Sequence, residues 1–152
     1  METLHYLSLG FGVALQPENL LFALMGCFIG TLIGALPGLG PANGVAILIP
    51  LAFTLGLKPE TALIMLTAVY AGAMYGGRIS SILLNIPGDE PAMMTCLDGY
   101  PMARQGKAAE ALAISAIASF MGSLIATIGL ILLAPLLARF ALTFGPAEYF
   151  AL

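Results

Sequence analysis

The sequence predicts an all-α integral membrane protein with several spanning helices and at least one broken or re-entrant helix. Apolar residues make up 60% of its 152 residues and charged residues only 9%, and the mean hydropathy is +1.01. A soluble domain carries about a quarter of its residues as charged side chains. No charged side chain lies between Glu18 and Lys58, or between Glu110 and Arg139. Each of these stretches exceeds the roughly 20 residues with which a helix crosses a bilayer, so we expect the chain to be embedded in the lipid bilayer.

The first predicted span covers residues 19–36, after a short segment up to Leu15 that we expect to lie at the membrane interface. Pro17 and Glu18 suit the start of a helix, and we expect Asn19 to cap it. Glycines recur at every fourth position within the span, at Gly26, Gly30 and Gly34. Because a stripe of small residues lets another helix approach closely, we expect these glycines to serve tight helix packing.

Two prolines and three glycines interrupt the chain between Pro37 and Gly44. A helix cannot continue through them, yet they lie inside the first charge-free stretch. Two ordinary spans joined by a turn would explain this. So would a helix broken inside the membrane, where protein or a water-filled cavity satisfies the freed backbone groups. The apolar piece at residues 43–56 is short and contains Pro50, so we favour a broken or re-entrant hairpin whose second helix starts near Asn43.

A second break follows two further helical segments, predicted at residues 60–76 and 79–86. The pattern Pro-Gly-x-x-Pro closes an apolar helix both at 37–41 and at 87–91. The second break contains two carboxylates, for which solvated or helix-capping roles are expected, at Asp89 and Glu90. The two similar breaks suggest a common structural use.

Arg78 is a charge inside an otherwise apolar stretch. An arginine at the centre of a membrane helix costs about 2.5 to 3.5 kcal/mol on insertion scales. It therefore needs a carboxylate partner, a wet cavity or a helix end from which it can snorkel to the interface. A second use for this side chain is to meet a carboxylate of a substrate.

The rest of the chain is predicted as a polar loop over residues 93–110 and a long span over residues 107–137. Hydroxyl side chains recur at every fourth position of this span, at Ser115, Ser119, Ser123 and Thr127. Such a stripe is expected to face protein or a cavity rather than lipid. Residues 146–152 have the character of the first turns of another helix, so we expect the sequence to be truncated.

The residues favour a transporter over an enzyme. The sequence contains no set of nucleophile, histidine and acid, no metal-binding cluster and no phosphate-binding loop. Its five basic and eight acidic residues leave no cationic face for nucleic acid. Broken helices instead offer an N-terminus that suits an anionic group, and C-terminal carbonyls that suit Na⁺. We therefore expect no cofactor except a coupling ion, Na⁺, held by backbone carbonyls near Asn85 and Ile86; the alternative is that these groups only cap helices.

Three motifs resemble the large permease subunit of tripartite tricarboxylate transporters, the TctA type. They occur in order between residues 34 and 103: GALPGLGP at Gly34–Pro41, YGGRISSILLNIPG at Tyr75–Gly88 and DGYPMA at Asp98–Ala103. The resemblance implies one part of an inverted-repeat secondary transporter in the bacterial inner membrane. It also implies two partner proteins, a small membrane subunit and a periplasmic solute-binding protein. The latter would deliver citrate or another carboxylate for uptake driven by an ion gradient.

The same resemblance suggests which residues bind substrate or ion. They lie in the two breaks and in the segment before the second one, at Pro37, Gly38, Gly40, Asn43, Arg78, Ser80, Ser81, Asn85, Pro87 and Gly88. Members of the family are several-fold longer, with a second half similar to the first. The alternative is a non-transporting membrane anchor or assembly subunit that is complete at this length.

Overall fold

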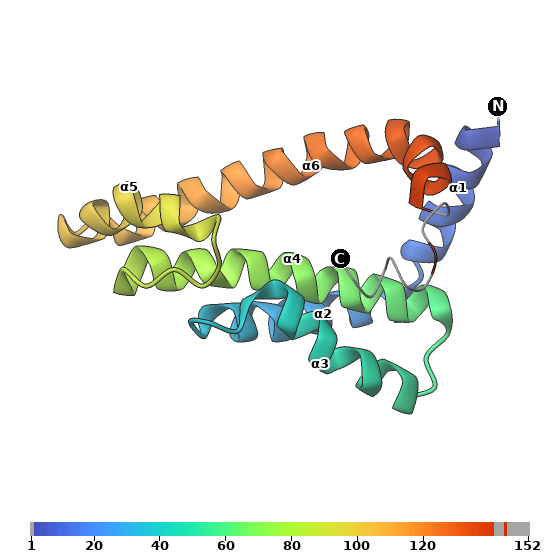
Figure 1. Cartoon of the computed structure of the whole chain (residues 1–152), viewed down its shortest axis with the longest axis horizontal. Coiled ribbons are helices and arrows are strands. Elements are labelled where there is room, and N and C mark those ends of the chain that lie inside the picture. Colours follow the sequence, from blue (N-terminus) through green and yellow to red (C-terminus); the bar gives the residue numbers. More distant parts are fainter. Residues whose placement is uncertain (1, 142–144, 146–152) are drawn as a thin grey trace. The chain divides into compact units, whose positions relative to one another are not determined.

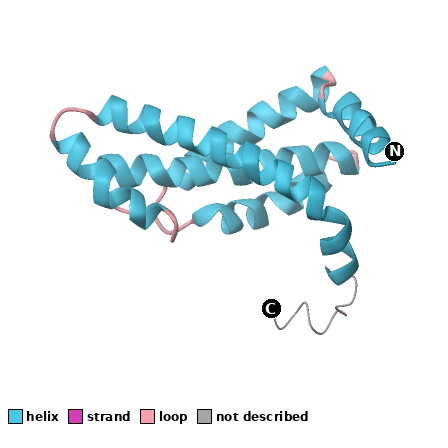
Figure 2. Ribbon diagram, turned by 90° about the horizontal axis from the view of Figure 1, so that it is seen from above, coloured by secondary structure: helices cyan, strands magenta, loops and turns pink. Residues whose placement is uncertain are grey.

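The described part of the chain folds into helices and loops, which confirms the predicted all-α class. The computed structural model describes residues 2–141 and Gly145, and for residues 2–4 and 134–141 it describes the backbone alone. Figure 2 shows helices joined by short loops, and no strand occurs in the residues described. The helices are α1 (Glu2–Ala14), α2 (Pro17–Ala35), α3 (Gly40–Thr54), α4 (Pro59–Leu84), α5 (Ala92–Arg104) and α6 (Ala108–Ala141).

Three of these helices contain a segment long and apolar enough to cross a membrane. The segments are Pro17–Ala35, Pro59–Leu84 and Ala108–Leu133. With 26 residues, α4 is about 39 Å long at 1.5 Å per residue, whereas α3, with 15, reaches only about 22 Å. Side chains on the outer faces of these helices, such as Leu24, Phe28 and Leu63, are largely exposed. This distribution of apolar side chains is that of a membrane protein.

The central contact of the first compact unit, Met1–Ser115, is between α2 and α4. The predicted glycine stripe of α2 packs directly on the α4 backbone, which confirms its expected role. A Cβ added at Gly30 or Gly34 would collide with the carbonyl group of Val69 or Ala73, and one at Gly26 would lie 2.5 Å from the Met65 carbonyl oxygen. As the position on α2 advances, the contacted position on α4 advances with it. The two helices therefore run in the same direction.

Glycines of α4 face α2 in return. A Cβ at Gly72 would collide with the Cys27 carbonyl oxygen. One at Gly76 would collide with the carbonyl oxygen of Thr31 and lie 2.7 Å from the Ala35 nitrogen. Both helices thus contribute glycines to one interface, and their backbones lie in van der Waals contact.

A buried polar link joins α1, α2 and α4 at the end where α2 and α4 begin. The Asn19 side chain is 3% exposed, and its Nδ2 donates to the Val13 carbonyl at 2.7 Å. The Thr61 hydroxyl donates to Asn19 Oδ1 at 2.7 Å. The expected capping role of Asn19 is therefore wrong: Gln16 occupies the cap position, and Asn19 lies in the first turn of α2. Burial against α4 supplies the side chain with better partners than the helix start does.

The first break separates α2 from α3, and α3 begins at Gly40 rather than near Asn43. Gly38 and Gly40 have positive φ angles of 90° and 63°. Because glycine adopts this left-handed backbone without a steric penalty, the chain reverses within the four residues 36–39. From there α3 returns along α4 and α2, towards the end at which α2 began.

One helix replaces the two segments predicted at residues 60–76 and 79–86, because α4 continues from Pro59 to Leu84. The predicted boundary between the two segments falls at the Gly76-Gly77 pair. The pair instead serves close contacts, since Gly76 faces α2 and a Cβ at Gly77 would lie 3.2 Å from Asp89 Oδ1. The Ser80 and Ser81 hydroxyls both donate to the Gly77 carbonyl, at 2.9 and 2.8 Å. Packing therefore overrides the weak helix propensity of glycine here.

The expected polar loop over residues 93–110 is also wrong, because α5 occupies Ala92–Arg104. Gly99 is buried, and a Cβ there would lie 2.7 Å from Ile82 Cγ1, so this glycine is a packing position rather than a turn. Pro101 is accommodated inside the helix. Figure 1 shows that the segment after α4 first runs back beside α4, and that α5 then runs in the same direction as α4.

The second unit, Ala116–Leu152, holds the greater part of α6. Of the predicted hydroxyl stripe, Ser123 donates to the Phe120 carbonyl and Thr127 donates to the Ser123 carbonyl, at 2.9 and 2.7 Å. The expected orientation of this stripe, towards protein or a cavity rather than lipid, stays a prediction. The helix predicted at residues 146–152 lies outside the described residues.

Candidate functional site

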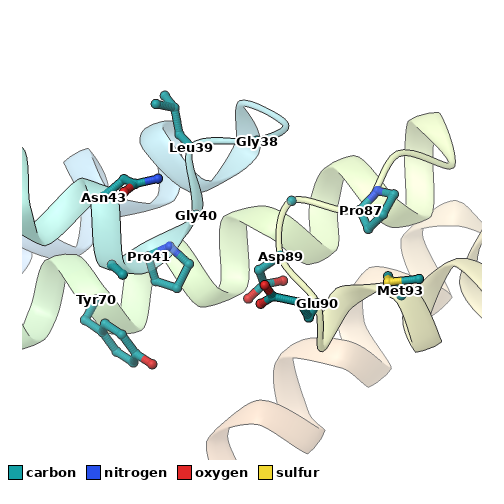
Figure 3. Close-up of a pocket in the computed structure, with 12 residues that line it drawn as sticks. Gly38, Leu39, Gly40, Pro41, Asn43, Tyr70, Pro87, Asp89, Glu90 and Met93 are labelled. Atoms are coloured by element: carbon teal, nitrogen blue, oxygen red, sulfur yellow. The ribbon is translucent and has the colours of Figure 1, made fainter. Parts of the chain in front are cut away.

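The two Pro-Gly breaks meet in one pocket of about 490 Å³ within the first unit (Figure 3). The first break contributes the start of α3, and the second contributes the loop between α4 and α5. Tyr70 of α4 and Met93 of α5 complete the wall. The lining residues are Gly38, Leu39, Gly40, Pro41, Ala42, Asn43, Tyr70, Pro87, Gly88, Asp89, Glu90 and Met93.

The first turn of α3 forms one wall of this pocket. Its cap residue, Leu39, makes no side-chain hydrogen bond, and Pro41 stands at the start of the helix. The first amide groups of an α-helix have no partner within the helix, and they carry a partial positive charge. The Asn43 side chain is exposed and adds a neutral amide to this wall. This wall therefore suits the binding of an anionic group.

The loop after α4 forms the opposite wall and is acidic. Figure 3 shows the Asp89 and Glu90 carboxylates projecting from this loop towards the side on which Pro41 lies. Asp89 Oδ1 accepts the Ala92 N–H at 3.2 Å, so the helix-capping role expected for this loop is confirmed for Asp89. Asp89 Oδ2 is buried and has no hydrogen-bond partner among the residues described.

Gly88 allows the acidic loop to pack closely against α4 and the end of α2. A Cβ at Gly88 would lie 2.6 Å from Gly77 Cα and 2.8 Å from the Gly34 carbonyl oxygen. The loop therefore contacts α4 and the end of α2 through its backbone. As a result, the neighbouring Asp89 carboxylate lies against Gly77, where a Cβ would lie 3.2 Å from Oδ1.

Half of the predicted site residues line the pocket. These are Gly38, Gly40, Asn43, Pro87 and Gly88. Outside the lining, Pro37 is exposed, Arg78 is half-buried on α4, and Ser80 and Ser81 are buried against α4's own backbone. Their binding roles stay predictions.

Asn85 also lies outside the pocket lining. It is the cap residue after α4 and is exposed, with a left-handed backbone at φ 59°. Its N–H donates to the Ser81 carbonyl at 3.2 Å. This arrangement favours the alternative in which Asn85 ends a helix, and its role as an ion ligand stays a prediction.

Sequence reasoning missed the contribution of Tyr70, Met93, Asp89 and Glu90 to the pocket. Tyr70 and Met93 carry no pattern that marks them, because their place depends on the packing of α4 and α5. The carboxylates do stand inside the repeated Pro-Gly-x-x-Pro motif. The second copy of the motif contains two charged residues and the first copy contains none. This difference was the signal that could have identified the carboxylates as site residues. No group of three or more His, Cys, Asp or Glu that could hold a metal ion occurs in the described part of the chain.

Comparison with known proteins identifies two similarities. The family described as the tripartite tricarboxylate transporter TctA family matches residues 20–152. An uncharacterized 52.8 kDa protein in the TAR-I ttuC' 3'region of Agrobacterium vitis is 48% identical over all 152 residues, which cover 30% of that protein. The chain thus spans less than a third of the length of this curated relative. No solved structure matches the chain.

Proposed function

The chain belongs to the tripartite tricarboxylate transporter TctA family, and from this premise we propose that it forms part of a permease for carboxylates. In this proposal the permease lies in the bacterial inner membrane and takes up citrate or a related carboxylate by symport with an ion, Na⁺. A periplasmic solute-binding protein delivers the substrate, and a small membrane subunit completes the transporter.

The pocket that joins the two breaks is the observation on which the proposal rests. Pairs of interrupted helices whose ends face one cavity are the recurring design of ion-coupled transporters. Here the start of α3 offers amide groups to an anion, and Asn43 offers a further donor. The acidic loop opposite offers oxygen atoms to a cation. An anchoring subunit, the alternative from the sequence, has no need of a pocket in which groups of both kinds face each other.

Substitution of Asn43 tests the anion-binding wall. In the intact permease containing this sequence, expressed with its partner proteins, Asn43→Ala is expected to raise the half-saturating carboxylate concentration about tenfold or more. A hydrogen bond to a charged group contributes about 1.5 to 3 kcal/mol, and each 1.4 kcal/mol corresponds to a factor of ten. Uptake of radiolabelled citrate, normalised to permease abundance in the membrane, measures the effect.

Thr54→Ala at the other end of α3 is the matched control. The Thr54 hydroxyl donates only to the Pro50 carbonyl of its own helix, at 2.8 Å, and lies outside the pocket lining. Its removal is expected to leave uptake unchanged. Equal uptake kinetics for Asn43→Ala and the unmodified permease would exclude the α3 wall as the substrate site. The absence of carboxylate uptake by the complete transporter would favour the anchoring alternative.

A further inference from the structure

The Asp89 carboxylate has one satisfied and one unsatisfied oxygen. Oδ1 accepts the Ala92 N–H at the start of α5. Oδ2 is buried without a hydrogen-bond donor in the part of the chain that the structure describes. A buried acceptor without a partner is costly, and more so when it carries charge. Such a group in a pocket points to a ligand that supplies the missing contact.

The backbone prevents this carboxylate from moving away to find a donor elsewhere. Gly88, directly before it, is held against Gly77 and the Gly34 carbonyl with no space for a Cβ. Asp89 itself occupies the space left by the absent side chain of Gly77. The end of α2 and α4 therefore hold the loop, and with it the Asp89 carboxylate, at the wall of the pocket.

The unsatisfied carboxylate oxygen suits a small cation as its ligand. A small hard cation takes carboxylate and carbonyl oxygens as ligands, and it keeps water molecules for its remaining positions. The pocket of about 490 Å³ has room for these waters.

We propose that Asp89 Oδ2 is the protein ligand that binds the coupling sodium ion in this pocket. This inference rests on the proposed function, because it names the residue through which the ion gradient acts. It replaces the carbonyls near Asn85 and Ile86, which lie outside the pocket lining, as the centre of the ion site. Glu90 and Tyr70 are the other titratable groups that line the pocket, and both are exposed.

The position of the ion also explains coupling to the substrate. Without a cation, the Asp89 charge faces the wall on which a substrate carboxylate would bind, and it repels that carboxylate. Bound Na⁺ removes the repulsion and adds an attraction. By linkage, the substrate strengthens Na⁺ binding by the same factor as Na⁺ strengthens substrate binding.

The decisive experiment measures Na⁺ binding without substrate. The purified intact permease containing this sequence is titrated with NaCl against KCl at constant ionic strength and fixed pH, and its thermal unfolding midpoint is recorded. Na⁺ is expected to stabilise the unmodified protein in a saturable way. Asp89→Asn keeps the Oδ1 acceptor for Ala92 and removes the charge, so it is expected to raise the half-saturating Na⁺ concentration about tenfold or more.

Asp98→Asn is the matched control, because Asp98 is an exposed carboxylate on α5 outside the pocket lining. Its Na⁺ titration is expected to match that of the unmodified protein. Gly77→Ala is a second variant: its added Cβ would lie 3.2 Å from Asp89 Oδ1 and press the carboxylate out of its present position, so it is expected to weaken Na⁺ binding as well. This variant decides the question if Asp89→Asn is absent from the membrane.

Two outcomes would overturn the assignment: no Na⁺ stabilisation of the unmodified protein, or equal Na⁺ titrations for Asp89→Asn and the unmodified protein. A carboxylate uptake assay on the same proteins separates this failure from failure of the proposed function. Uptake that depends equally on Na⁺ in both proteins keeps the permease and rejects Asp89. Na⁺ binding that Asp89→Asn abolishes, without carboxylate uptake, keeps the ion site and rejects the substrate.

Discussion

Asn85 has a left-handed backbone, at φ 59°. Among the described residues it is the only one other than glycine with a positive φ. Asparagine tolerates this conformation better than most residues, and glycine adopts it without penalty. The exposed amide side chain has no role in the geometry of the helix end. Substitutions of Asn85 can therefore distinguish between a backbone role and a ligand role for this residue.

We expect Asn85→Gly to preserve both carboxylate uptake and thermal stability of the intact permease. Asn85→Val is expected to lower the free energy of unfolding by about 1 to 2 kcal/mol, because a β-branched residue is strained in the left-handed region. Thermal unfolding in detergent and uptake normalised to abundance measure the two effects. Lost uptake in Asn85→Gly at normal abundance would instead identify the amide as a ligand.

Single residues also show where sequence patterns are insufficient. Asn19 was expected at a helix start because asparagine favours caps, but its burial against Thr61 depends on a helix more than forty positions later. Asp89 was assigned a capping or solvated role, and the structure shows the cap for one oxygen only. The other oxygen is buried by contacts with Gly77, which no local pattern reveals.

Among the helices, the α2–α4 pair is where a local repeat predicted packing correctly. Gly26, Gly30 and Gly34 share one face of α2 because residues four apart lie above one another. The sequence could not identify α4 as the partner, because pairing between helices is a tertiary property. The continuity of α4 through Gly76-Gly77 and the helix α5 were missed for the same reason: their glycines are packing positions.

Substitution of Gly30 tests the pair. Gly30→Val is expected to lower permease abundance in the membrane and its unfolding midpoint strongly, since the side chain would collide with the Val69 backbone. Overpacking of this kind costs about 1 to 3 kcal/mol or more. Gly12→Ala in α1, where a Cβ meets nothing within 4 Å, is the control and is expected to be neutral or slightly stabilising. A stable, abundant Gly30→Val protein would contradict the packing.

The path of the whole first unit determines which loops share a side of the membrane. Parallel α2 and α4 begin at the same end, which α3 reaches by returning along them. The sequence predicted both breaks, and the resemblance to the family placed them in one binding site. Residues about fifty positions apart come together only because α3 reverses the chain and because the loop after α4 folds back to Gly77.

Cysteine labelling tests this path. In the intact permease, with Cys27 and Cys96 replaced by serine, Gln16→Cys and Lys58→Cys are expected to react with an impermeant reagent from the same side of the membrane. Gln105→Cys, after α5, is expected to react only from the opposite side. All three positions are exposed. Labelling of Gln16→Cys and Lys58→Cys from opposite sides would contradict the parallel arrangement of α2 and α4.

The direct backbone contact between α2 and α4 determines which parts of this unit can move. Two helices whose carbonyl groups fill each other's glycine positions cannot slide by a fraction of a turn without collision, because close-packed contacts have discrete arrangements. The pair is therefore expected to move as one rigid body. A change in the shape of the pocket is then expected at the start of α3, which follows the left-handed Gly38 and begins at the left-handed Gly40.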